Sequence, residues 1–301
     1  MAQVISAMIW VAFSTLQPSS LVLELRVPQA DYVLYEPVIL QYDVRNPTTE
    51  TIPSAIVLDW SALQIKFLIT GPDGVSRRLK SPVIRCAMAK RVVHEPGSVM
   101  GASAELGWTG RLSAFPSPGP YTVQVILDTP WYPLAIHLES EPIQIQIRKP
   151  VGADAQAISY FDSEDEFVRL LAAGPGRYCR GSKGPVCFEE VRRFLAQHHK
   201  SAYAPTIAIN LASAVRNQHI EVEPRHDLAV DLYREFLERW PTHPLAPKSM
   251  YALALCLDRA GRVEEAAAVI LRFEAEFPAE RRMADALRMN LVSGRVLKGR
   301  E

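Results

Sequence analysis

The sequence predicts an all-β domain followed by an all-α domain, a multidomain chain of the all-β plus all-α class. Through residues 21–149, apolar and polar residues alternate, which is typical of strands with one buried face. Beyond residue 150, apolar residues recur every three or four positions, which is typical of helices. A length of 301 residues agrees with about two domains.

The N-terminal half contains segments that read as strands, separated by turn residues. The clearest strands are 21–27, 38–44, 64–70, 121–127 and 143–147. The turns fall at 46–47, 71–74, 96–97 and 118–120, where glycine, proline and asparagine gather. Alternating apolar and polar residues give each strand one buried and one solvent-exposed face, which favours antiparallel sheets. About seven strands at this spacing favour a β-sandwich.

Three motifs of this half resemble bacterial immunoglobulin-like domains. Segment 36–40 (EPVIL) with 46–48 (NPT) resembles their second strand and turn. Segment 94–98 (HEPGS) resembles the turn before their fifth strand, and 119–123 (GPYTV) their penultimate strand. The resemblance implies an immunoglobulin-like antiparallel β-sandwich over 21–149, in which the Tyr121 hydroxyl bonds nearby backbone to form a corner. The cysteine pair and spaced tryptophan of antibody domains are absent.

Residues 150–161 read as a linker, and residues 162–301 as helical. Ser163 and Glu166 form a capping-box pattern that predicts a helix start. The sequence of this helical region contains an internal repeat. Residues 194–205 align without a gap with 236–247, and a third copy begins at Phe273. Repetition of this kind predicts stacked helical hairpins.

The best copy, residues 247–278, resembles a tetratricopeptide repeat. Ala254 and Ala266 are small where two helices would cross, Gly261 suits a positive-φ turn between them, and Pro278 would end the second helix. The resemblance implies a short tetratricopeptide-like α-solenoid over 162–301, with about three hairpins and a capping helix over 279–296. An unrelated helical bundle is the alternative.

The first twenty residues have the pattern of a secretory signal peptide. Residues 4–16 form an apolar run too short to span a bilayer, and 12–14 give a small-x-small cleavage pattern. No Lys or Arg precedes the run, so a buried structural segment is the alternative. We therefore expect residues 1–20 to be a signal peptide, and the protein to be exported, periplasmic or extracellular, and bacterial.

The chain has four cysteines. Cys179 and Cys187 bracket a polar loop with two glycines and a proline, which predicts a disulfide in an exported protein. The alternative is two free thiols. We expect Cys86 and Cys256 to be core thiols.

We identify no catalytic, cofactor-binding or metal-binding residues from the sequence. The motifs of α/β-hydrolases, zinc proteases, P-loop proteins and dinucleotide-binding folds are absent. The loop between His219 and His226 is a weak metal pattern, and a nucleophile at Cys86 or Cys179 stays open. Equal numbers of acidic and basic residues, 33 each, give no electrostatic case for nucleic acid.

Two features suggest protein binding. Trp131 and Tyr132 stand between prolines in a loop, where rigid aromatics make good anchors. The alternative is that both rings fold back over the end of the sheets. The first helices of the hairpins would line a concave face, for which a solvated surface without a partner is the alternative. The candidate positions on that face are Asn210, Arg216, Lys248, Tyr251 and Arg259.

The sequence thus favours a non-enzymatic, exported scaffold or adaptor that binds protein partners, as part of a larger cell-envelope or extracellular assembly. We expect no cofactor, no nucleic acid partner and no transmembrane segment. One alternative is a carbohydrate- or peptidoglycan-binding module that uses Trp131 and Tyr132. A further alternative is an unrecognised hydrolase.

Overall fold

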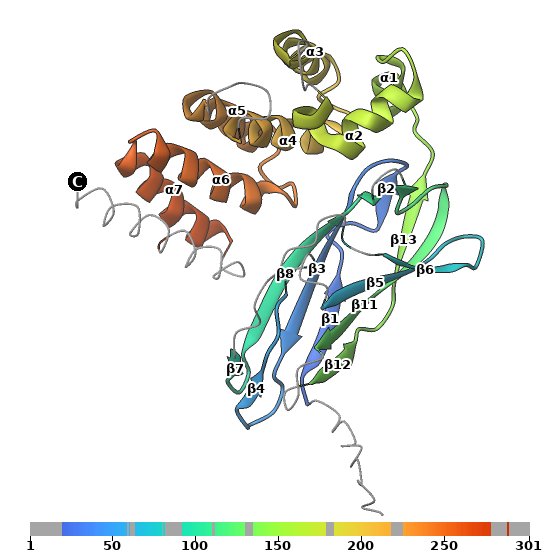
Figure 1. Cartoon of the computed structure of the whole chain (residues 1–301), viewed down its shortest axis with the longest axis vertical. Helices are drawn as coiled ribbons and strands as arrows, with labels where there is room; N and C mark the ends of the chain where they lie inside the picture. Colours follow the sequence, from blue (N-terminus) through green and yellow to red (C-terminus); the bar gives the residue numbers. More distant parts are fainter. Residues whose placement is uncertain are drawn as a thin grey trace, which may run out of the picture.

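The computed structural model describes residues 20–58, 60, 64–79, 81, 92–109, 112–129, 135–178, 184–217, 225–277 and 288. Strands occupy the chain up to Arg148 and helices follow from Ala153 (Figure 1). The predicted order of a β half and an α half is therefore confirmed. We call residues 21–148 the strand half and residues 153–277 the helical half.

The strands of the first half agree with the predicted segments and add shorter ones. They are β1 (Val22–Arg26), β2 (Asp31–Val33), β3 (Val38–Arg45), β4 (Ile52–Ser54), β5 (Ile65–Thr70), β6 (Ser76–Leu79), β7 (Val92–His94), β8 (Val99–Leu106), β9 (Trp108–Thr109), β10 (Leu112–Ser113), β11 (Gly119–Thr129), β12 (Ile136–Glu139) and β13 (Ile143–Arg148).

Two main sheets make up the strand half. One has the order β1-β3-β8 and the other β2-β13-β11-β5-β6, with β12 also pairing with β11. The pairings within these sheets are antiparallel, except that β2 runs parallel to β13. Inward side chains of both sheets share one core, in which the rings of Tyr42 and Phe67 meet edge to face at 5.8 Å.

The Tyr121 hydroxyl makes the backbone contact that the sequence predicts. It donates a 2.8 Å hydrogen bond to the carbonyl of Ser117, and it accepts one from the Ser117 N–H at 3.2 Å. The ring is buried at the start of β11. These two bonds fix the chain segment that leads into the longest strand.

The helices of the second half follow one another with short connections. They are α1 (Ala153–Ser159), α2 (Glu164–Tyr178), α3 (Gly184–Gln197), α4 (Ala204–Arg216), α5 (His226–Arg239), α6 (Ala246–Arg259) and α7 (Val263–Glu276). Helix α2 packs on α4, and α4, α5, α6 and α7 pack in chain order. The Ser163 hydroxyl caps α2 by accepting from the Glu166 N–H at 3.2 Å.

The structure differs from the expected linker over 150–161. Residues 153–159 form α1, and Ala157 and Phe161 are buried in the core of the helical half. The hinge pattern in the sequence covers only Lys149–Gly152. The residues that follow it carry no pattern that shows the helical core to begin at once.

The sequence repeat corresponds to a structural repeat. Phe194, Phe236 and Phe273 are fully buried near the ends of α3, α5 and α7. The backbone carbonyl of each phenylalanine accepts a hydrogen bond from the N–H of the residue four positions later. Its ring also contacts the aromatic ring of that later residue, at centroid distances of 5.2, 5.4 and 5.6 Å. The partner rings are His198, Trp240 and Phe277.

The turn between α6 and α7 uses glycine as predicted. Gly261 has φ of +78°, a conformation that L side chains rarely adopt. Ala254 and Ala266 are fully buried in α6 and α7. The predicted capping helix over 279–296 lies outside the described residues, apart from residue 288. Among the described helices, none is long and apolar enough to cross a membrane.

Candidate functional site

The turn between β2 and β3 enters the helical half. Val33 and Ile39, which flank this turn, belong to the same apolar cluster as the helix side chains. The Tyr203 hydroxyl donates to the backbone carbonyl of Leu34 at 2.9 Å, and the Tyr35 hydroxyl donates to the Glu164 carboxylate. Figure 1 shows this end of the sheet beneath α1 and α2. The two halves therefore meet through packed side chains as well as through the chain.

A second tie lies beside the connection between the halves. Arg148 ends β13, and its Nη1 lies 3.2 Å from Oδ2 of the buried Asp154 in α1. Asp154 Oδ1 accepts a 2.8 Å hydrogen bond from the Ala202 N–H, which lies just before α4. The Asp154 carboxylate, which belongs to α1, thus contacts both the end of β13 and the residues that precede α4.

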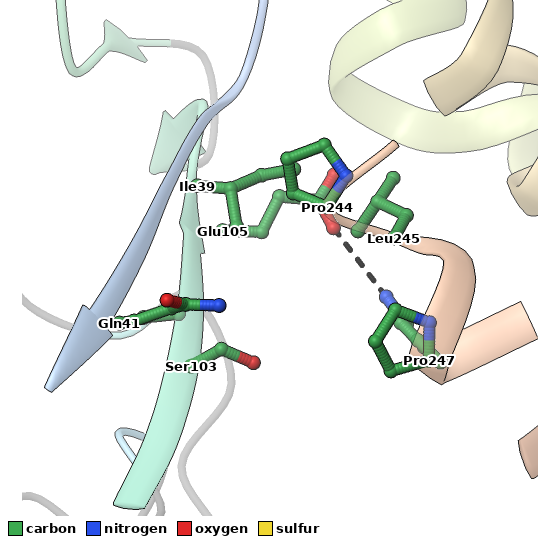
Figure 2. A pocket seen from close by; sticks show the side chains of 9 residues that line it. Ile39, Gln41, Ser103, Glu105, Pro244, Leu245 and Pro247 are labelled. Atoms are coloured by element: carbon green, nitrogen blue, oxygen red, sulfur yellow. Dashed lines mark hydrogen bonds and ion pairs between the residues drawn. The ribbon is translucent and has the colours of Figure 1, made fainter. Parts of the chain in front are cut away.

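A cleft opens between the outer face of the β1-β3-β8 sheet and the start of α6 (Figure 2). Its volume is about 110 Å³. Apolar side chains come from both halves, and the polar side chains come from the strand side except for Lys248 of α6. The lining residues are Ile39, Gln41, Ser103, Ala104, Glu105, Pro244, Leu245, Pro247 and Lys248.

Cross-strand register explains the strand side of the cleft. Gln41 lies opposite Ser103, and Ile39 lies opposite Glu105, in the pairing of β3 with β8. Directly opposite residues share a face of the sheet, so these four side chains form two neighbouring rows. Figure 2 shows Gln41 and Ser103 pointing across the gap toward Pro247. They are uncharged polar groups on the strand side of the cleft.

One ion pair spans the cleft. Lys248 Nζ lies 3.4 Å from Glu105 Oε2, so α6 and β8 contact each other through opposite charges (Figure 2). The Lys248 side chain is 55% exposed, which places it at the rim. A pair this exposed contributes little to stability, and the lysine is free to meet another acceptor.

His243 supports the helical side of the cleft. Its Nδ1 accepts a 3.2 Å hydrogen bond from the Leu245 N–H, which holds the turn before α6. Burial lowers the pKa of His243 to about 4, although the Glu105 charge opposes this shift. The imidazole is therefore neutral at physiological pH and acts as an acceptor, with its proton on Nε2.

The cleft continues onto a polar sheet surface. On the outer face of β1 and β3, Arg26 pairs with Asp43, and Arg45 pairs with Glu24 at 3.2 Å. Asp43 fits because Gly101 lies opposite it, where an added Cβ would clash with Asp43 Oδ1. This surface has its charges balanced in pairs, so it does not favour a strongly charged partner.

The predicted partner-binding residues lie in several places. Lys248 lies in the cleft, whereas Asn210 and Tyr251 are partly buried in α4 and α6. Arg216 and Arg259 end α4 and α6, and their charges both act on His226 at the start of α5, whose pKa is lowered first by burial and then by these charges. The structure thus gathers Arg216 and Arg259 at one end of the stack, away from Lys248.

Several predicted residues lie outside the described residues. They are Trp131, Tyr132, Cys179, Cys86 and His219. Cys187 is disulfide-bonded. Because Cys179 is not among the described residues, the pairing of Cys179 with Cys187 stays a prediction.

Two potentially reactive sites that the structure describes, Cys256 and the Ser54–His94 pair, are enclosed. Cys256 is a buried free thiol, as predicted, and burial raises its pKa to about 11. The Ser54 hydroxyl and His94 Nε2 lie 2.8 Å apart, but Ser54 is 0% and His94 2% exposed. A buried Ser–His pair that no substrate can reach serves as a structural hydrogen bond. Within the described residues, no group of three or more His, Cys, Asp or Glu side chains could hold a metal ion.

Sequence reasoning found Lys248 but missed the rest of the cleft. One signal was present: in the strand 38–44, the inward positions are 38, 40, 42 and 44, yet the outward Ile39 is also apolar. An apolar residue on an otherwise polar face indicates that something covers that end of the strand. The partner of that face comes from residues 244–248, which local patterns could not identify.

No family model and no curated protein matches the chain. Among solved structures, the chain resembles a β-glucosidase from Listeria innocua at 13% identity and a TM-score of 0.25, over 42% of this chain and 16% of that one. It also resembles a β-glucosidase from Erythrobacter marinus at 16% identity and a TM-score of 0.24, over 42% of this chain and 15% of that one. The chain therefore spans less than a fifth of these enzymes, and a likeness this weak supports no assignment of fold or activity.

Proposed function

We propose that the strand half is an immunoglobulin-like β-sandwich and the helical half a short tetratricopeptide-like solenoid. The shared core of the two sheets and the Tyr121 corner support the first assignment. The repeated buried phenylalanines of α3, α5 and α7 and the positive-φ Gly261 support the second. The domain division that follows is a sandwich over 21–149 and a helical domain over 153–301, which includes α1.

On this architecture we propose a non-enzymatic scaffold that is exported in a bacterium and holds partner polypeptides in an envelope or extracellular assembly. The observation that carries the proposal is the cleft between the halves. It presents side chains from both halves to one ligand, and its volume of about 110 Å³ suits one side chain of a partner segment. Sites at domain junctions of this kind are common places for ligands.

The lining indicates which segment would bind. Ile39, Pro244 and Leu245 offer apolar contact, so the inserted side chain would be aliphatic or a proline. Gln41 and Ser103 would hydrogen-bond the backbone on either side of it. Lys248 and Glu105 at the rim would exchange their mutual ion pair for charges on the partner. An extended, mostly uncharged segment of a partner protein satisfies these groups best.

Affinity capture from the envelope of the source organism tests the scaffold proposal. The wild-type protein should recover a stoichiometric polypeptide partner, identified by mass spectrometry. Ser103→Trp fills the cleft and should reduce recovery at least tenfold. Ser76→Trp is the matched control, because Ser76 is exposed on β6 in the other sheet. Recovery of the protein alone under gentle conditions, or equal capture by both variants, would overturn the proposal.

A further inference from the structure

The outward residues of β8 form a strip that leads away from the cleft. We call this the β8 strip, and it consists of Val99, Gly101, Ser103 and Glu105. Ser103 and Glu105 line the cleft, whereas Val99 lies at the other end of the strand. In Figure 1, β8 leads away from the helical half toward β7. The strip therefore joins the cleft to the far end of the strand half.

The β8 strip is open to solvent and has small side chains in its middle. Gly101 and Ser103 are both exposed. Position 101 is a glycine because Asp43, opposite it in β3, occupies the space where a Cβ would lie. At the end of the strip, Val99 is 54% exposed. A segment that leaves the cleft along β8 thus passes over small residues and reaches an apolar contact.

The neighbouring strands carry longer side chains than the middle of the strip. On β1 and β3, Arg26 pairs with Asp43, and Arg45 pairs with Glu24 at 3.2 Å. These charges are matched within the sheet. The charge of the strip itself is that of Glu105, at the cleft, where Lys248 faces it. A segment above the strip therefore meets paired charges, which favours an uncharged ligand.

The spacing along the strip sets the length of the bound segment. Strand residues advance about 3.3 Å each, so Val99 lies about 13 Å from Ser103 and about 20 Å from Glu105. An extended segment covers this distance in about four to six residues. A helix is about 10 Å across with its side chains, which is too wide for a cleft of about 110 Å³.

We propose that the partner of the cleft is an extended, uncharged polypeptide segment that lies along β8, with one apolar side chain in the cleft and a second on Val99. The two apolar residues are about four to six positions apart in the partner. This inference rests on the proposed function of the cleft and adds the path and spacing of the ligand. Val99 then determines specificity as the second apolar anchor.

Photo-crosslinking with peptide mapping tests this path. A benzophenone amino acid replaces Val99 or Lys248 in the full chain, in the source organism, and the crosslinked peptides are sequenced by mass spectrometry. Position 22 is the matched control. Val22 is also an exposed valine, at 43%, and it also lies opposite Arg45, but on β1.

Positions 99 and 248 should give adducts with the same partner polypeptide, at residues about four to six positions apart, and position 22 should give none. An adduct at 248 without one at 99, equal adducts at 22 and 99, or adducts at distant partner residues would overturn the path and leave the scaffold proposal standing. Adducts with a second copy of this chain would also overturn it. No adduct at any position would overturn both proposals.

A charge at each valine gives a second readout. Val99→Glu and Val22→Glu both place a carboxylate opposite Arg45, and neither disturbs the core because both valines are exposed. Val99→Glu should lower recovery of the crosslinked polypeptide in affinity capture roughly tenfold, because binding would bury the new charge against an apolar side chain. Val22→Glu should leave recovery unchanged. Equal recovery with the two variants would contradict the proposed path.

Discussion

The hydroxyl of Tyr203, at the start of α4, donates a 2.9 Å hydrogen bond to the backbone carbonyl of Leu34, in the turn between β2 and β3. The two residues are 169 positions apart in the chain. Because Tyr203 is fully buried, this bond forms only when the strand half and the helical half are docked.

Removing this hydroxyl should weaken docking. Tyr203→Phe leaves the Leu34 carbonyl without its side-chain donor in an enclosed site, which should lower the free energy of unfolding by about 1–2 kcal/mol. Urea unfolding, followed by far-UV circular dichroism, measures the change. The reference variant is Tyr233→Phe, whose hydroxyl lies 3.0 Å from the Ser213 hydroxyl within the helical half. Wild-type stability of Tyr203→Phe would show that the bond contributes nothing.

The turn between α6 and α7 should resist a side chain for a backbone reason alone. An added Cβ at Gly261 meets no atom within 4 Å, yet its φ is +78°. Gly261→Ala should therefore cost about 1–2 kcal/mol from strain, and Gly261→Asn less, because asparagine tolerates this conformation better. Thermal unfolding distinguishes the two variants. Equal stability of Gly261→Ala and the wild type would contradict the positive-φ turn.

The repeated phenylalanines should be the main apolar contributors to the stack. Phe273 is fully buried, whereas Leu271, two positions earlier on the same helix, is 66% exposed. Phe273→Ala should cost about 3–5 kcal/mol because it leaves a cavity. Leu271→Ala should change stability by less than about 0.5 kcal/mol. A similar loss for both variants in urea unfolding would mean that the stack is not packed as described.

The cysteine state tests the proposed export. In the denatured but unreduced protein, a maleimide label should modify Cys86 and Cys256 alone, and all four cysteines only after reduction. Peptide mapping by mass spectrometry should find Cys179 joined to Cys187. Labelling of all four thiols in protein isolated from its native compartment would contradict both the disulfide and an oxidising location.

Local features of the structure were predictable from the sequence, and long-range ones were not. Tyr121, Gly261 and the capping Ser163 act through groups within a few residues, so short motifs identify them. The docking of Val33 and Ile39 into the helical half depends on shape complementarity between distant segments. Periodicity shows that a strand has an apolar position, but it does not show what covers that position.

The same limit explains the candidate site. Lys248 was predicted as an exposed helix position, but its role at the cleft depends on Glu105, a strand residue 143 positions away. Gln41 and Ser103 are ordinary outward-facing polar residues in their strands. They become a site because α6 begins opposite them, and no local pattern specifies that arrangement.

Site-specific photo-crosslinking in the source organism tests the scaffold account most directly. A benzophenone amino acid replaces Lys248 at the rim of the cleft or, as the control, Glu139 on β12, whose side chain is 49% exposed. The account predicts a discrete adduct with one partner polypeptide from position 248, and none from position 139. No adduct at either position, or the same adducts at both, would contradict a partner-binding cleft between the two halves.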